Sequence, residues 1–415
     1  MLSFVRLNDV DDVVTATRPL EAGTPIENVK TATLIPRGHK IATHAIAAGE
    51  PVRKYAQIIG FAREDIAPGT HVHDHNLAFR ATDFEYQFST NLREPPAPLQ
   101  QDVFQGYRRE SGKVGTRNYI ALLTSVNCSA TAAHKIAAHF TPERLAPYPN
   151  VDGVVAFAHG TGCGMAGSGD GFAALQRTMW GYARHPNHGA VLMVGLGCEI
   201  NQIDWLLEAY GLKQGPCFAT MNIQDNAGLR RTVDAGIAQV EAMLPAANEA
   251  KREPCPAAGL TVALQCGGSD AWSGITANPA LGYACDLLVA QGGIGLLAET
   301  PEIYGAEHLL AERAATRAVG EKLISRIKWW EDYVARNKGS MDNNPSPGNK
   351  RGGLSTILEK SLGAAAKGGT TPLTGVYEYA EEARVPGFGF MDSPGYDPAS
   401  VTGQIASGSN VVVFT

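Results

Sequence analysis

Four short apolar runs of this chain each lead into a cysteine among small residues. The runs lie at residues 119–126, 151–158, 190–194 and 260–264. Each is short enough to be a buried strand, so each cysteine follows the C-terminal end of a strand. Ligands bind at that edge of an open α/β sheet. The pattern predicts a parallel α/β fold in which four thiols meet at a catalytic or metal centre. They belong to Cys128, Cys163, Cys198 and Cys266.

The composition is that of a globular chain without a basic block. The 415 residues are 44% hydrophobic and 18% charged, which suits two or three domains with large cores. Because the net charge is −6, we expect no nucleic-acid partner and no anionic membrane. No run approaches the ~18 apolar residues of a membrane span. The acidic N-terminal segment is unlike a secretory signal, so we expect a cytoplasmic protein.

Turn signals and prolines divide the chain into four segments. Evenly spaced turn signals in residues 1–80 predict a small β domain, and residues 81–104 form a proline-rich linker. Residues 105–300 alternate between strand and helix patterns, which predicts a first α/β catalytic domain with a mostly parallel sheet. Residues 301–415 combine a long helix near 305–337 with a second α/β segment. Prolines and a glycine argue against a regular helix at 342–350, and the final strand at 411–415 suggests a truncated C-terminus.

Candidate metal ligands occur in two of these segments. The odd number of cysteines, seven, does not suggest a disulfide framework, and thiolates and imidazoles are good ligands for iron and zinc. Cys128, Cys163 and Cys198 follow successive strands, so they can meet at one metal ion or at an iron–sulfur cluster. His71 and His73 would share one face of a strand as ligands for a divalent metal. The alternatives are small cysteines buried under loops and histidines in a solvated turn.

Two polar residues beside these cysteines are candidate catalytic groups. His159 lies in a glycine-rich loop and can serve as a ligand or general base, or it can hydrogen-bond to the backbone of a tight loop. Glu199 follows Cys198 at the start of a predicted helix, where it can transfer protons or only interact with the helix dipole. Glu299 follows another strand, and the sequence favours a helix N-terminus there over a proton-transfer group.

A further set of candidates suits the binding of a carboxylate. The backbone N–H groups of Gly267 and Gly268 can approach a carboxylate closely. Asp270 can bind sugar hydroxyls or cap a helix, and Arg351 can contact a carboxylate through two hydrogen bonds. Lys350 can pair with the same carboxylate, act as a base, or stay solvated. The predicted substrate-binding residues are Gln265, Gly267, Gly268, Ser269, Asp270, Asn349 and Arg351.

Four motifs resemble those of the altronate/galactarate dehydratase family. They are Gly-Leu-Gly-Cys-Glu at 195–199, Cys-Gly-Gly-Ser-Asp at 266–270, Ser-Gly-Ile-Thr-Ala-Asn-Pro at 273–279 and Asn-Pro-Ser-Pro-Gly-Asn-Lys at 344–350. The motifs are long, ordered as in that family and spread over nearly the whole chain. Residues 1–80 resemble the β-clip (SAF-type) domain that precedes the catalytic part of these enzymes.

The residues leave the branch of the family open. The His-Val-His-Asp-His-Asn segment at 71–76 is similar to the altronate branch, whereas segments 124–128, 265–266 and 271–273 are similar to the galactarate branch. The His-Gly-Thr-Gly-Cys loop at 159–163 departs from both patterns, which have a tyrosine before the Gly-Cys. Sulfolactate sulfo-lyases share the same two-part architecture.

The resemblance implies a lyase that removes water from a sugar acid. A proton leaves the carbon next to the carboxylate, the 3-hydroxyl departs, and a 2-keto-3-deoxy acid results. The family implies Fe²⁺ or Mn²⁺, with an Fe–S cluster as an alternative. It also favours Lys350 as a catalytic residue beside His159 and Glu199, and it continues past the final strand into a further site element. The expected metal ligands are His71, His73, Cys128, Cys163 and Cys198.

Two other classes of function compete with the dehydratase. An electron-transfer protein with an Fe–S cluster usually has closely spaced cysteines such as C-x2-C, and this sequence has no such pair. A periplasmic binding protein for sugar acids would begin with a signal peptide. We therefore expect an enzyme whose partner is a small sugar acid, and a homo-oligomer suits so apolar a chain.

Overall fold

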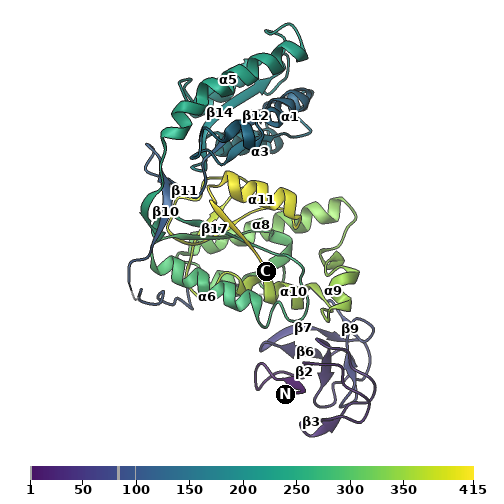
Figure 1. The fold of residues 1–415 in the computed structure, drawn as a ribbon. Helices are drawn as coiled ribbons and strands as arrows, with labels where there is room; N and C mark the ends of the chain where they lie inside the picture. Colours follow the sequence, from purple (N-terminus) through teal and green to yellow (C-terminus); the bar gives the residue numbers. More distant parts are fainter. Residues whose placement is uncertain (1, 82–84, 99) are drawn as a thin grey trace.

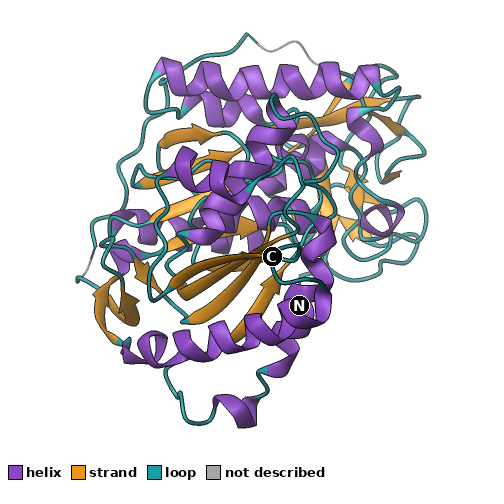
Figure 2. Ribbon diagram, turned by 90° about the horizontal axis from the view of Figure 1, so that it is seen from above, coloured by secondary structure: helices purple, strands orange, loops and turns teal. Residues whose placement is uncertain are grey.

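The computed structural model describes residues 2–81, 85–98 and 100–415. Three units follow one another in space (Figure 1). We call residues 2–81 the N-terminal domain, 119–249 the middle domain and 261–415 the C-terminal domain. The C-terminal domain lies between the other two, so the N-terminal and middle domains occupy opposite ends of the molecule. Helices lie on both sides of the strands in the α/β part (Figure 2).

The N-terminal domain consists of short strands joined by tight turns. Strands β1, β2, β5 and β8 form one antiparallel sheet, and β6, β7 and β9 form another. Gly69 shows why glycine punctuates this domain: its φ is +82°, and a Cβ there would lie 1.9 Å from the carbonyl oxygen of Lys30. The strands are β1 Phe4–Val5, β2 Val13–Ala16, β3 Pro25–Ile26, β4 Val29–Lys30, β5 Lys40–Ala42, β6 Pro51–Lys54, β7 Gln57–Ala62, β8 His71–Val72 and β9 Leu77–Ala78.

The middle domain has a parallel sheet in the order β13-β12-β14-β15. Alternate residues of β12 face opposite layers: Ile120 and Leu122 pack with helices α1 and α5, whereas Ala121 and Leu123 pack with α3 and α4. The elements are β12 Tyr119–Thr124, η1 Asn127–Ser129, α1 Ala130–His139, α2 Pro142–Leu145, β13 Gly153–Phe157, α3 Asp170–Ala183, β14 His188–Gly195, α4 Ile203–Tyr210, β15 Phe218–Asn222 and α5 Leu229–Glu249.

The C-terminal domain has a second parallel sheet in the order β19-β20-β18-β17-β21. Helices α6 and α8 pack on one face, and α11 lies against the other. A small antiparallel sheet of β10, β11 and β16 joins the two α/β domains. The elements are β10 Val103–Arg108, β11 Val114–Gly115, β16 Glu253–Pro256, η2 Ala257–Gly259, β17 Thr261–Gln265, α6 Ala277–Ala290, β18 Ile294–Leu297, η3 Thr300–Ile303, α7 Glu307–Glu312, α8 Arg317–Arg336, η4 Met341–Asn343, α9 Pro347–Arg351, α10 Ile357–Ala366, β19 Leu373–Tyr377, β20 Gly387–Met391, α11 Asp397–Ala406 and β21 Val411–Phe414.

The expected fold class, a small β domain followed by mostly parallel α/β domains, is confirmed. The expected division at residue 300 differs from the sheet topology, because β17 and β18 pair with β21 and β20 rather than with the first sheet. An apolar run identifies a strand but not the sheet that it joins.

Two helix expectations were also wrong in detail. The helix expected near 305–337 is interrupted at 313–316, where Ala314 bridges to Leu373 beside β19. Despite the prolines of the 342–350 segment, the short helix α9, Pro347–Arg351, forms in the last part of this segment and ends one residue beyond it. Pro347 occupies the first turn, where its missing N–H costs nothing, and Ser346 and Asn349 form a reciprocal cap.

The predicted linker, 81–104, includes residues 82–84 and 99, which lie outside the described residues. Part of it is fastened to the C-terminal domain. Ser89 N and Thr90 N donate to the carbonyls of Ala311 and Glu312 over 3.4 and 2.8 Å, and the hydroxyl of Ser89 donates to Ala314 O over 2.8 Å. Among the described residues, no helix has the length and apolar character needed to cross a bilayer.

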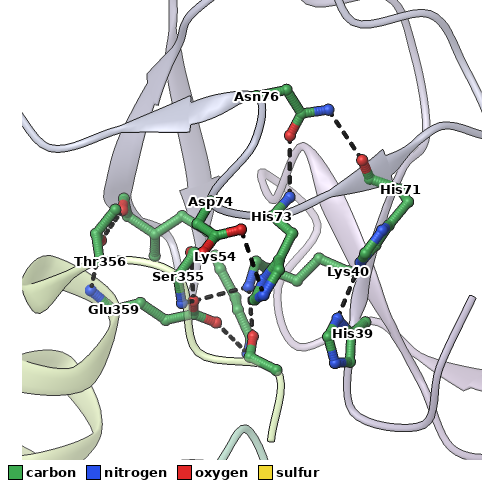
Figure 3. Close-up of polar contacts among 12 residues, drawn as sticks. His39, Lys40, Lys54, His71, His73, Asp74, Asn76, Ser355, Thr356 and Glu359 are labelled. Carbon is green, nitrogen blue, oxygen red and sulfur yellow. Dashed lines mark hydrogen bonds and ion pairs between the residues drawn. The ribbon is translucent and has the colours of Figure 1, made fainter. Parts of the chain in front are cut away.

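A buried ion triad joins the N-terminal domain to the C-terminal domain (Figure 3). Lys40 and Lys54 contact the two carboxylate oxygens of Glu359 over 2.8 and 2.9 Å, and all three side chains are 0% exposed. Ser355 also donates to Glu359 over 2.8 Å. Burial alone would raise the pKa of Glu359, but the two ammonium groups hold it well below its usual range. The carboxylate is therefore ionised and fully paired.

Glu359→Gln should destabilise the protein by about 3–5 kcal/mol, because it leaves two buried ammonium groups without a counter-charge. Urea unfolding monitored by circular dichroism measures this loss. The control Glu321→Gln removes an exposed ion pair with Arg317 and should change stability little.

The contribution of Glu359 is also expected to depend on pH. Its pKa is lowered by folding, so its stabilisation is complete above the ordinary value of 4.5 and declines as the pH falls through the lowered pKa. Equal stability of Glu359→Gln and the unmodified protein near neutral pH would contradict this account of the docked domains.

Candidate functional site

Three histidines of the N-terminal domain lie together beside the C-terminal domain (Figure 3). Each of His39, His71 and His73 offers a ring nitrogen, and these atoms all lie within 4.8 Å of one another. Nδ1 of His39 is 2.9 Å from Nε2 of His71. The antiparallel pairing of β5 with β8 brings His39 to His71.

The expectation that His71 and His73 share one face of a strand is met only in part. Strand β8 ends at Val72, and His73 lies in the turn that follows. Asn76 fixes this turn: it accepts from His73 N over 3.0 Å and donates to His71 O over 2.9 Å. A strand and a turn, rather than one longer strand, therefore place the two rings in a stack.

The environment keeps these imidazoles neutral. Burial, followed by neighbouring histidines, lowers the pKa of His71 to about 3, and burial followed by Lys40 lowers the pKa of His73 to about 4. Burial also lowers the pKa of His39. Among the described residues, the buried Nδ1 of His73 has no hydrogen-bond partner. Neutral imidazole is the form that binds metals, so the donor set fits a divalent ion such as Fe²⁺ or Mn²⁺.

Helix α9 lies against the histidines and carries three predicted site residues. Nε2 of His39 is 3.1 Å from the carbonyl oxygen of Arg351, and Nζ of Lys350 lies 3.8 Å from Asp74. Asn349 donates to the carbonyl of Ser269 over 2.7 Å. The loop after β17 and the 344–351 segment, which are far apart in the sequence, therefore meet beside the histidines.

The carboxylate of Asp270 and the amide of Gly267 are already engaged within this loop. Asp270 accepts from the backbone N–H groups of Trp272 and Ser273 over 2.8 and 2.9 Å. Gly267 N donates to Thr415 O over 2.7 Å. The contacts of Asp270 fit its predicted role as a cap. The space beside Gly268 is open, because a Cβ there would meet no atom within 4 Å.

An acidic and basic cluster occupies the C-terminal ends of β17 and β18. Lys360 donates to Glu302 over 2.7 Å and to Asn344 over 2.9 Å. The thiol of Cys266 lies 2.6 Å from the hydroxyl of Ser269 and also interacts with Glu302. Sequence reasoning missed Glu302 and Lys360, because only the fold brings a residue of α10 to the end of β18.

Glu299 has the most unusual environment of this cluster. It is 2% exposed, and its φ of 72° lies in the left-handed region that a non-glycine residue seldom adopts. Burial and the nearby charge of Glu302 raise the pKa of Glu299 to about 8. Burial opposes ionisation of Glu302 too, but Lys360 and Lys367 keep its pKa below the usual range. The two carboxyl groups thus have pKa values driven in opposite directions.

Gln265 connects this cluster to α11. Its side-chain oxygen accepts from Ser400 over 3.2 Å, and its amide group lies 3.4 Å from Asp397. It is fully buried and also contacts Glu299. Gln265, a predicted substrate-binding residue, therefore lies between this cluster and α11.

The other thiols gather in the middle domain. Cys128, Cys163 and Cys198 are exposed, and Cys128 interacts with both of the others. Cys266 does not join them, since β17 belongs to the other sheet. The expected single group of four thiols is therefore corrected to three at one sheet and one at the other.

His159 and Glu199 also lie in the middle domain, where their polar atoms are engaged. Nε2 of His159 is 2.8 Å from the carbonyl of Thr124, and Nδ1 accepts from Thr161 N. Glu199 accepts from the hydroxyl of Ser125 over 2.5 Å and from Gly197 N over 2.7 Å. These contacts favour the backbone hydrogen-bond alternative for His159. The helix start expected at Glu199 is wrong, because α4 begins only at Ile203, and the contacts of Glu199 stabilise the loop after β14.

The predicted metal ligands thus fall into two groups. His71 and His73 lie with His39 at one end of the C-terminal domain, and the cysteines lie in the domain at its other end (Figure 1). No sequence pattern indicated that His39 joins the first group, because the pairing of β5 with β8 links residues 32 positions apart.

Known proteins match every part of this arrangement. The model described as "Altronate/galactarate dehydratase SAF domain" matches residues 2–80, and "D-galactarate dehydratase/Altronate hydrolase, second domain" matches residues 106–248. The model described as "D-galactarate/Altronate dehydratase, C-terminal" matches residues 257–415. The boundary between the second-domain match and the C-terminal match falls between the segments that form the two parallel sheets.

Full-length relatives agree with these matches. Altronate dehydratase of Bacillus subtilis is 36% identical over 100% of this chain and 83% of the relative. Altronate dehydratase of Escherichia coli is 35% identical over 100% of this chain and 83% of the relative. Galactarate dehydratase (L-threo-forming) of Escherichia coli is 35% identical over 99% of this chain and 81% of the relative. The chain belongs to the altronate/galactarate dehydratase family.

Proposed function

We propose that the protein is a metal-dependent sugar-acid dehydratase that converts an altronate-like aldonate into a 2-keto-3-deoxy acid. The dehydratases named above support this class of substrate. One observation carries the proposal: three neutral imidazoles, one buried and two partly buried, lie against α9 and the loop after β17. Residues suited to a carboxylate and to proton transfer border the same two segments.

The histidines are the ligands that we assign to the metal. His39, His71 and His73 would hold Fe²⁺ or Mn²⁺, and a bound ion supplies Lewis-acid stabilisation for negative charge on the substrate carboxylate. The chain itself keeps the rings neutral by burial. Asn76 fixes the turn that presents His73.

Cationic residues of α9 are assigned to the substrate carboxylate. Lys350 and Arg351 occupy the last turn of α9, and the carbonyl of Arg351 contacts His39. Arg351 can form a bidentate contact with a carboxylate. Asn349 holds this turn against Ser269, so the carboxylate-binding residues keep a fixed position relative to the loop after β17.

Glu299 is assigned as the general base. Its pKa of about 8 is close to a neutral working pH, as efficient proton transfer from carbon requires. The carboxylate of Glu299 takes the proton from the carbon next to the substrate carboxylate. The bond from the adjacent carbon to its hydroxyl then breaks, the hydroxyl takes up the proton from Glu299 and leaves as water, and the enol rearranges to the 2-keto acid. Glu302, held ionised by Lys360, tunes the base by charge repulsion.

Loss of a histidine ligand should weaken metal binding. His73→Ala removes a nitrogen from the cluster, and we expect at least a tenfold loss of Mn²⁺ affinity, as measured by the electron paramagnetic resonance signal of free Mn²⁺. The control His44→Ala changes an exposed histidine of the same domain and should bind Mn²⁺ normally. Equal affinity in both variants would remove the histidines from the metal site.

The pH dependence of the reaction should identify Glu299. A base with a pKa of about 8 makes kcat/KM rise with pH and level off above that value, and Glu299→Gln should lose at least a hundredfold in kcat. Glu302→Gln removes the charge that raises the pKa of Glu299, so the rising limb should move to lower pH. Circular dichroism checks that both variants are folded. An unshifted limb in folded Glu302→Gln would exclude Glu299 as the titrating base.

The overall proposal is tested with a panel of acids. Altronate, galactarate and sulfolactate are offered separately to the Fe²⁺-loaded protein under anaerobic conditions, and the 2-keto product is followed by its semicarbazone absorbance. We expect turnover of altronate. Turnover of galactarate alone would correct the branch, and release of sulfite from sulfolactate without any 2-keto-3-deoxy product would overturn the dehydratase assignment.

A further inference from the structure

Three loops of the middle domain present one exposed cysteine each at the same sheet edge. Cys128, Cys163 and Cys198 follow β12, β13 and β14, the adjoining strands in the order β13-β12-β14. The thiol of Cys128 donates to Oδ1 of Asn127 over 3.7 Å and interacts with the thiols of Cys163 and Cys198. By contrast, Cys255, Cys266 and Cys285 are buried. Core packing explains Cys255 and Cys285, and Cys266 belongs to the polar cluster after β17, but neither explanation covers the exposed three.

Backbone hydrogen bonds connect these loops directly. Asn127 N donates to Thr161 O over 2.8 Å, which joins the first loop to the second. Ile200 N donates to the carbonyl of Cys163 over 3.2 Å, and Asn201 N donates to the carbonyl of Gly162 over 3.2 Å, which joins the third loop to the second. The relative positions of the three thiols are thus set by the main chain.

A buried polar layer supports the loops from below. Glu199 is 3% exposed and accepts from Ser125 and from the backbone after β14. The side chain of Asn201 donates to Ser125 O over 2.9 Å. His159 holds the second loop to Thr124. Exposed thiols on so rigid a support are preorganised for a ligand, since few further groups must be ordered when it binds.

The spacing of the sulfur atoms distinguishes between kinds of ligand. Among the described residues, the histidines are the group whose donor atoms all lie within 4.8 Å of one another, so at least one pair of the three sulfur atoms is farther apart than that. A single tetrahedral ion with metal–sulfur bonds of about 2.3 Å needs sulfur atoms only about 3.8 Å apart. An iron–sulfur cluster accepts a wider spacing, because iron and sulfide atoms stand between its cysteine ligands.

We propose that Cys128, Cys163 and Cys198 ligate an iron–sulfur cluster in the middle domain, separate from the histidine site. Each thiol loses its proton to solvent as it binds iron. Cys128 lies in η1, the short turn that leads into α1. Cys217, the remaining cysteine of this domain, lies before the start of β15 and hence at the opposite edge of the sheet. One iron is therefore left for a ligand other than cysteine.

The test measures cluster content without any sugar acid. The protein is incubated anaerobically with sulfide and a mixture of ferrous and ferric iron, which supplies both oxidation states of a cluster, and is then desalted and assayed for iron, acid-labile sulfide and the Mössbauer spectrum. We expect sulfide-bridged iron in the unmodified protein and in the controls Cys217→Ser and His73→Ala. Cys163→Ser and Cys198→Ser should lose most of the acid-labile sulfide while keeping the circular dichroism spectrum and melting temperature of the unmodified protein.

The outcomes separate this inference from the proposed function. Absence of labile sulfide from the reconstituted protein would overturn the cluster, as would undiminished sulfide in folded Cys163→Ser and Cys198→Ser. A protein that carries the cluster but converts no acid of the panel would support the inference and contradict the dehydratase proposal. Conversely, turnover by protein that cannot take up sulfide would contradict the inference alone.

Discussion

The pairing of Glu359 with Lys40 and Lys54 is the contact on which the candidate site depends. Two of its charges come from the N-terminal domain and one from the C-terminal domain, and none reaches solvent. Separation of the domains would leave these charges without their partners, so the docked arrangement is strongly specified. Lys40 is next to His39 in the chain and also donates to the carbonyl of Gly353 over 2.7 Å, just past α9. The same contact therefore positions the histidines against the helix that carries Lys350 and Arg351.

The sites follow from one rule applied twice. Each parallel sheet collects polar side chains at the C-terminal ends of its strands. In the C-terminal domain those ends carry Glu299, Glu302 and Cys266, and the N-terminal domain adds imidazoles from the side. In the middle domain they carry three thiols without a neighbouring cluster of imidazoles among the described residues. The same arrangement of strands and loops thus presents two different sets of polar side chains.

The local features of this fold were predictable from sequence, because they depend on short segments. The apolar runs before Cys128 and Cys163 became β12 and β13, and the family motifs identified the SAF-type domain. Partners set by topology were not predictable. Nothing near Cys266 in the sequence says that β17 joins a different sheet from β14, and His39 meets His71 only through antiparallel pairing. For the same reason the contact between Lys360 and Glu302 could not be predicted. The proposed roles of the predicted residues are tested by the experiments described above.

The fastened part of the linker has a consequence for assembly. Residues 89 and 90 are hydrogen-bonded to the end of α7 and to the connection that follows it, so the free chain between the two domains is shorter than the linker as a whole. A shorter tether raises the effective concentration of one domain at the surface of the other. The imidazoles consequently reach α9 as an intramolecular partner at any protein concentration, and dilution alone does not dismantle the centre.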